Sequence, residues 1–95
     1  MPRIDLTQQA TEIRRLAAAH GVLRVRVFGS RARGEPSTAS DLDLLVDLAP
    51  DRDLLDLIAF KQDVEDLLEC RVDVLTEAAL SPYLRDGVLA EARSL

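Results

Sequence analysis

The sequence predicts an α/β fold: a small mixed sheet of three strands, or slightly more, flanked by helices. Three observations carry this prediction. Three segments show the apolar periodicity of amphipathic helices, short runs rich in Val and Leu have the pattern of strands, and turn residues separate these segments. With 95 residues, 47% of them hydrophobic and 31% charged, the chain has the composition of one globular domain, which we expect to span residues 1–95.

The first half of the chain predicts a helix followed by a strand. Residues 6–19 repeat apolar side chains at helical spacing, and Gly21 stands where a helix commonly ends. The following segment, VLRVRVFGS, predicts a strand of roughly six residues, because its valines point to one face and its arginines to the other.

The second half predicts two more strands and two helices. Residues 29–40 form a small polar segment with Gly and Pro, typical of a loop. The run DLDLLVDL at 41–48 predicts the second strand, and RVDVLT at 71–76 predicts the third. A long helix is expected to open at Pro50 and Asp51, and a last one at Ser81-Pro82 that reaches about Arg93.

Both of these helices carry apolar stripes. In the longer one we expect the stripe to pack in the core rather than to bind a cofactor; its members are Leu54, Leu57, Ile58, Val64 and Leu68. The last helix has more apolar surface than one side of a three-strand core needs, so part of it is expected to face a partner chain.

Three carboxylates are the candidate catalytic and metal-binding residues. Residues i and i+2 of a strand point to the same face, so Asp41 and Asp43 project together. If the second and third strands are neighbours, Asp73 meets them on one surface. Hard oxygen ligands of this kind suit Mg²⁺, and two such ions about 3.5–4 Å apart clamp the attacking and leaving oxygens of an in-line displacement.

The residues after the first strand are candidates for nucleotide binding. Gly29 lets the backbone approach a ligand closely, and Ser30 adds a hydroxyl donor. A helical turn that follows them would direct free N–H groups at the phosphates of a nucleoside triphosphate. Arg31 and Arg33 add positive charge there, although both could equally be solvated.

Together, GSRARG, SDLDLLV and RVDVL resemble the nucleotidyltransferase superfamily that includes the DNA polymerase beta palm, and most closely its minimal (MNT) branch. The family pattern is Gly-Ser, then Asp-x-Asp, then a third Asp on a later strand. Here it falls on Gly29, Ser30, Asp41, Asp43 and Asp73. The resemblance implies a polymerase beta-like fold, Mg²⁺ with two ions expected, and transfer of AMP from ATP to a tyrosine hydroxyl of a HEPN-type toxin. The chain would then be an antitoxin, in a hetero-oligomer or as a homodimer.

Two other functions stay open. The chain could neutralise a toxin by binding alone, with a silent site, or transfer a nucleotide to a small molecule, for which the sequence offers no substrate domain. Direct binding of nucleic acid is disfavoured by the net charge of −5 and by only three aromatic residues. The sequence has no run long enough to span a membrane, and a lone Cys suits a reducing compartment, so we expect a cytoplasmic protein.

Four further residues have structural interpretations. His20 follows the first helix, where a cation stabilises the C-terminus, so we expect it to cap that helix. Asp47 is expected to be a surface charge rather than a fourth ligand, and Cys70 a buried or half-buried residue. Tyr83 could accept AMP in a self-modification, but packing is the favoured role.

Overall fold

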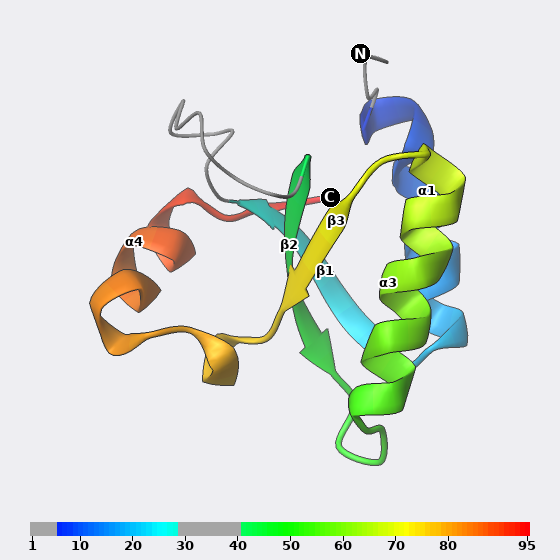
Figure 1. Ribbon diagram of the computed structural model, residues 1–95. Helices are drawn as coiled ribbons and strands as arrows, with labels where there is room; N and C mark the ends of the chain where they lie inside the picture. Colours follow the sequence, from blue (N-terminus) through cyan, green and yellow to red (C-terminus); the bar gives the residue numbers. More distant parts are fainter. Residues whose placement is uncertain (1–5, 29–40) are drawn as a thin grey trace.

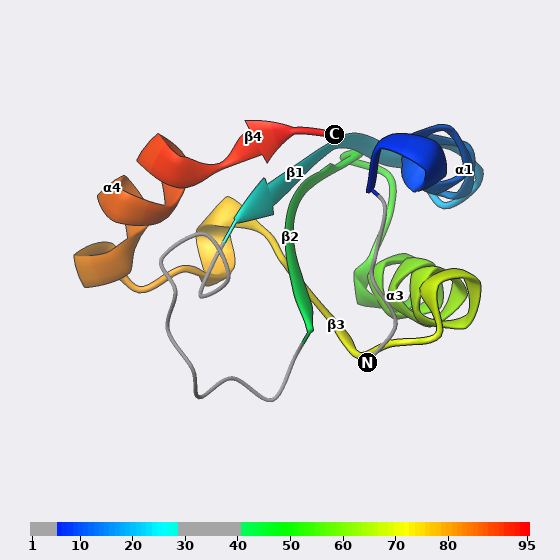
Figure 2. The ribbon, with the colours of Figure 1, turned by 90° about the horizontal axis from the view of Figure 1, so that it is seen from above.

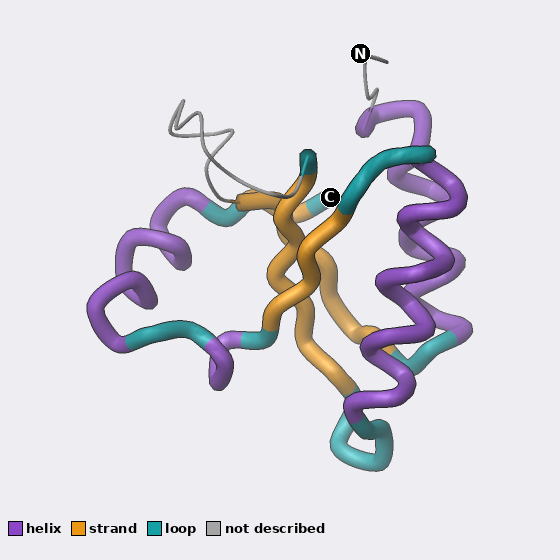
Figure 3. The backbone as a smooth tube through the Cα atoms, viewed as in Figure 1, coloured by secondary structure: helices purple, strands orange, loops and turns teal. Residues whose placement is uncertain are grey.

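The computed structural model describes residues 6–28 and 41–95, without the side chains of residues 6 and 7. It shows an open sheet with helices on either side (Figure 1), and Figure 3 separates strands from helices by colour. The elements, in chain order, are α1 (Leu6–Ala19), β1 (Val22–Phe28), β2 (Leu42–Leu48), α3 (Leu54–Leu68), β3 (Val72–Leu75), the 3₁₀ helix η1 (Glu77–Ala79), α4 (Pro82–Glu91) and β4 (Arg93–Ser94).

Among the described residues the sheet has four strands in the order β3-β2-β1-β4, which confirms the mixed α/β prediction. β2 is antiparallel to β1 and parallel to β3. The fourth strand was not predicted: the last helix ends at Glu91 instead of Arg93, and Arg93 and Ser94 pair antiparallel with β1. Extended backbone at this point supplies partners for the free edge of β1, which otherwise leaves N–H and C=O groups unpaired.

The start of α3 corrects the sequence prediction by about three residues. Pro50 belongs to a turn, closed by a hydrogen bond of 3.0 Å from Arg52 N to Ala49 O. The helix begins after Asp53, whose side chain accepts hydrogen bonds from two backbone N–H groups, while the Asp56 side chain accepts one from Asp53 N at 3.2 Å. This reciprocal capping box fixes where the helix starts.

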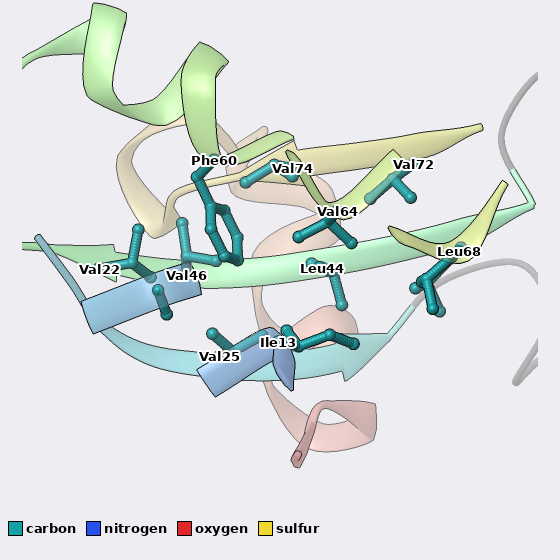
Figure 4. Packing of buried hydrophobic residues seen from close by; sticks show 12 residues of the cluster. Ile13, Val22, Val25, Leu44, Val46, Phe60, Val64, Leu68, Val72 and Val74 are labelled. Carbon is teal, nitrogen blue, oxygen red and sulfur yellow. The ribbon is translucent and has the colours of Figure 1, made fainter. Parts of the chain in front are cut away.

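One face of the sheet packs against α1 and α3 and forms the main core (Figure 4). The α3 side chains that reach it are Leu57, Phe60, Val64, Leu67 and Leu68. Phe60, which was not in the predicted stripe, is fully buried, whereas Leu54 and Ile58, which were, are exposed. A helix turns by about 100° per residue, so Ile58 points well away from the direction of Leu57.

The opposite face is covered in part by α4, which lies across the sheet from α1 and α3 (Figure 2). Val88 packs there with Phe28 and Leu45, and Leu89 and Ala92 adjoin them. At the start of α4, by contrast, Tyr83 is 96% exposed. The expectation that Tyr83 packs in the domain was therefore wrong, because the first turn of α4 extends beyond the apolar patch that Val88 covers.

Two other expectations concern residues around the main core. Cys70 is half-buried and packs against that core, as expected. His20 directly follows α1, and its ring Nε2 lies 2.6 Å from Asp63 Oδ2, so it links the end of α1 to α3. None of the described helices is long and apolar enough to cross a bilayer.

Candidate active site

The predicted carboxylates lie on two neighbouring parallel strands. β2 pairs with β3, and the register places Asp43 directly beside Asp73. The strands that carry Asp43 and Asp73 are therefore neighbours, as the candidate site requires. The reason is the alternation of side chains: Leu42 and Leu44 point into the main core, so the aspartates between and before them face the other side.

The three carboxylates differ in exposure. Asp43 is only 9% exposed, Asp41 is half-buried and Asp73 is exposed. On its other side Asp43 has Phe28 of β1 as register partner, so one flank of this carboxylate is apolar. Burial of a carboxylate costs free energy that hydrogen bonds or a cation must offset. A cation bound beside Asp43 and Asp73 would offset part of this cost.

Asp41 also fixes the strand that carries Asp73. Its backbone N–H donates to Arg71 O at 2.9 Å, and its carboxylate Oδ2 accepts from Arg71 N at 3.2 Å. These contacts hold the start of β3 beside the start of β2. A carboxylate has several acceptor positions, so this hydrogen bond leaves Asp41 able to ligate a metal.

Glu65 of α3 holds the same strand from the other face, and sequence reasoning missed it. Its Oε2 accepts from Val72 N at 3.0 Å, and its Oε1 accepts from Lys61 Nζ at 3.3 Å. The Val72 N–H is the main cause that lowers the pKa of Glu65, against a smaller opposing effect of burial. The helical spacing of Lys61 and Glu65 was visible in the sequence, but the backbone partner was not.

We expect Glu65→Gln to reduce the dependence of stability on pH. Because the pKa of Glu65 is lowered in the folded protein, its contribution is present above the unfolded value of 4.5 and is lost as the pH falls below that value. Melting temperatures from pH about 6 down to about 3 should therefore fall less steeply for the variant. Asp66→Asn, a change of an exposed acid on the same helix, is the control. Equal slopes for wild type and Glu65→Gln would contradict this role.

The donor set fits magnesium without forming a finished cage. Within residues 6–28 and 41–95, no group of three or more acidic, His or Cys side chains is gathered closely enough to hold an ion. Magnesium in nucleotide sites is usually held by one or two carboxylates, with phosphate oxygens and waters completing the shell. Asp41, Asp43 and Asp73 supply hard oxygen donors on one face, which is what such a shared shell requires.

The predicted nucleotide-binding residues cannot be placed. Gly29, Ser30, Arg31 and Arg33 lie outside the described residues. The structure does show that β1, the strand directly before these residues, ends at Phe28 beside Asp43.

A buried charge network lies further along the same face. Arg26 is only 8% exposed, and its Nη2 lies 3.0 Å from Glu77 Oε1 and 3.7 Å from Asp47 Oδ1. Glu77 Oε2 in turn lies 3.5 Å from Arg85 Nη2. Asp47 is thus a partly exposed partner of Arg26, on the side of the sheet where η1 and α4 are attached. Alternation predicted the face of Arg26, but nothing in the sequence placed η1 over it.

Comparisons with known proteins identify similar sequences and folds. A model of the nucleotidyltransferase domain matches residues 6–95. A relative from Methanocaldococcus jannaschii is 45% identical over 73 residues, which are 77% of this chain and 78% of the relative, and carries a protein adenylyltransferase name. The protein adenylyltransferase MntA of Thermococcus cleftensis is 39% identical over 71 residues, which are 75% of this chain and 72% of that protein.

Solved structures show the same fold. A minimal nucleotidyltransferase, 45% identical, superposes with a TM-score of 0.76 over 100% of both chains. A chain from the complex of a tri-AMPylated HEPN toxin and its MNT antitoxin of Shewanella oneidensis gives a TM-score of 0.69 over 95% of this chain and 71% of that one, with 18% identity. The family match and the close relatives show that this chain belongs to the nucleotidyltransferase family, in its branch of minimal, MNT-type nucleotidyltransferases.

Proposed function

We propose that this chain is a magnesium-dependent nucleotidyltransferase that transfers AMP from ATP to a tyrosine hydroxyl of a HEPN-type toxin, and so acts as an antitoxin. The observation that carries the proposal is the register of β2 and β3. It sets Asp43 beside Asp73, with Asp41 two residues earlier on the same face. Relatives named protein adenylyltransferases support the reaction.

Each carboxylate has a separate part in the proposed reaction. Asp41 and Asp43 hold the metal, and the triphosphate lies against Gly29 and Ser30. Asp73, the exposed member, orients the acceptor hydroxyl and takes its proton. When bound, magnesium neutralises the phosphates and stabilises the attacking and leaving oxygens. The hydroxyl oxygen attacks the α-phosphorus, and pyrophosphate leaves.

The acceptor is proposed to be a protein because the carboxylates lie on an open sheet face. Asp73 is exposed, and the described part of the chain has no second domain over it. Positioning is a large part of phosphoryl-transfer catalysis. A partner protein that supplies the acceptor hydroxyl and covers the carboxylates with its own surface would therefore complete the site. The complex of an AMPylated HEPN toxin with an MNT antitoxin, which shares this fold, supports a partner of that kind.

Magnesium together with ATP should raise the melting temperature of the isolated chain. A ligand that binds only the folded state stabilises by about 2.7 kcal/mol at a concentration of 100 times its Kd. The measurement is a thermal melt with ATP and magnesium, with ATP and EDTA, and with magnesium alone. The same melt on Asp43→Asn is the control and should show a reduced shift. No shift for wild type at millimolar ATP and magnesium would contradict the proposed site.

A further inference from the structure

The first turn of α4 presents a tyrosine to solvent. Tyr83 is the only tyrosine of the chain and is 96% exposed, and Leu84 beside it is also exposed. Aromatic side chains normally bury most of their surface, and an exposed ring with an apolar neighbour marks a surface that other molecules can contact. Neither the core nor the carboxylate site accounts for this side chain.

Local contacts define the start of α4, which carries Tyr83. Pro82 occupies the first turn of α4, where its fixed φ suits a helix start. Ser81 Oγ accepts a hydrogen bond of 3.3 Å from Tyr83 N and so caps the helix. Tyr83 is therefore displayed from a defined helix end.

Long-range contacts then fix that helix end to the sheet. Arg85, on the same turn as Tyr83, reaches Glu77, and Glu77 meets the buried Arg26 of β1. A buried arginine needs its carboxylate partner, because a lone buried charge is strongly unfavourable. This network, together with the packing of Val88 against Phe28 and Leu45, attaches α4 to the sheet.

Tyr83 stands ten residues after Asp73 in the sequence, beyond the end of β3. Asp73 lies near the start of β3, which runs on to Leu75 and then into η1 before α4 begins. In Figure 1 the start of α4 lies away from the starts of β2 and β3. A second copy of the chain, in contrast, can bring its open carboxylate face to an exposed phenol.

We propose that Tyr83 is an acceptor of the nucleotidyl group and is modified by a second copy of this chain. This inference rests on the proposed function. The Tyr83 phenol oxygen attacks the α-phosphorus of ATP held by the other copy and forms an O–P bond. The bond from the α-phosphorus to the bridging oxygen breaks and pyrophosphate leaves, while the phenolic proton passes to Asp73 of the other copy.

Two complementary variants, incubated with magnesium and ATP labelled on the α-phosphate, test the proposal. Tyr83→Phe keeps the site but lacks the acceptor hydroxyl, and Asp41→Asn with Asp43→Asn keeps the acceptor but lacks the site. Neither should be labelled alone, whereas a mixture should label the aspartate variant, identified by a size tag. Tyr83→Phe should keep the wild-type melting temperature, because the side chain is exposed. The cognate HEPN-type protein, added to wild type and to Tyr83→Phe, reports transfer independently.

Each result decides between the proposals. Wild type that stays unlabelled while the HEPN-type protein is labelled overturns the role of Tyr83 and leaves the proposed function standing. Equal label on wild type and Tyr83→Phe also overturns it, because another residue is then the acceptor. Label on Tyr83 of wild type, with none in the mixture, refutes transfer between copies. If neither the chain nor the HEPN-type protein is labelled, the proposed function itself fails.

Discussion

Asp41→Asn combined with Asp43→Asn should abolish AMP transfer while the chain stays folded. Asn has nearly the size of Asp, but it lacks the charge that, under the proposed function, would hold a metal beside the phosphates. The loss of one preorganised electrostatic contact typically lowers a rate by about 10²–10³-fold, so we expect at least about a hundredfold loss here. The measurement is transfer of labelled AMP to the cognate HEPN-type protein, with a thermal melt to confirm folding.

Asp47→Asn is the matched control for this pair. Asp47 lies on the same strand and the same face, but it pairs with Arg26 rather than facing Asp73. Its loss should leave transfer close to wild type. Transfer by the double variant at the wild-type rate would refute the assignment of the site.

The same double variant distinguishes an enzyme from an antitoxin that acts by binding. In cells that express the toxin, the enzymatic proposal predicts that the variant no longer protects, although it still forms the complex. Protection as complete as that of wild type would show that occlusion, not transfer, neutralises the toxin.

Phe60→Ala should cause the largest loss of stability among the substitutions proposed here. Phe60 is 0% exposed and packs between α3 and the sheet (Figure 4). Truncation of a fully buried Phe costs about 3–5 kcal/mol, from lost burial and from the cavity that remains. For a domain of this size we expect the melting temperature to fall by more than about 10 °C.

Leu55→Ala serves as the control, because it removes an apolar side chain from the same helix at a position that is 73% exposed. A change within about 0.5 kcal/mol is expected there. Comparable losses for both variants, measured by denaturant unfolding, would mean that α3 does not bury the face that contains Phe60.

The sequence by itself determined the faces of the strands and the carboxylates that share them. A strand alternates its side chains whatever its neighbours are, so DLDLLVDL and RVDVLT assign Asp41, Asp43 and Asp73 to faces from local pattern alone. Caps and apolar periodicity are equally local, which is why α1 and the start of α4 match the prediction. The start of α3 was misplaced because both Asp51 and Asp53 are possible caps in the sequence. In the structure Asp53 is the cap, with the reciprocal hydrogen bonds of a capping box.

Only the tertiary structure decided which strands are neighbours and which apolar side chains are buried. The pairing of β2 with β3, which sets Asp43 beside Asp73, depends on contacts across some thirty residues of sequence. Three other features also depend on contacts between distant parts of the sequence. They are the burial of Phe60 instead of Leu54, the position of η1 over Arg26 and the exposure of Tyr83. Local periodicity gives each segment its shape, but the free energy of burial and pairing is set by surfaces that meet only when the chain folds.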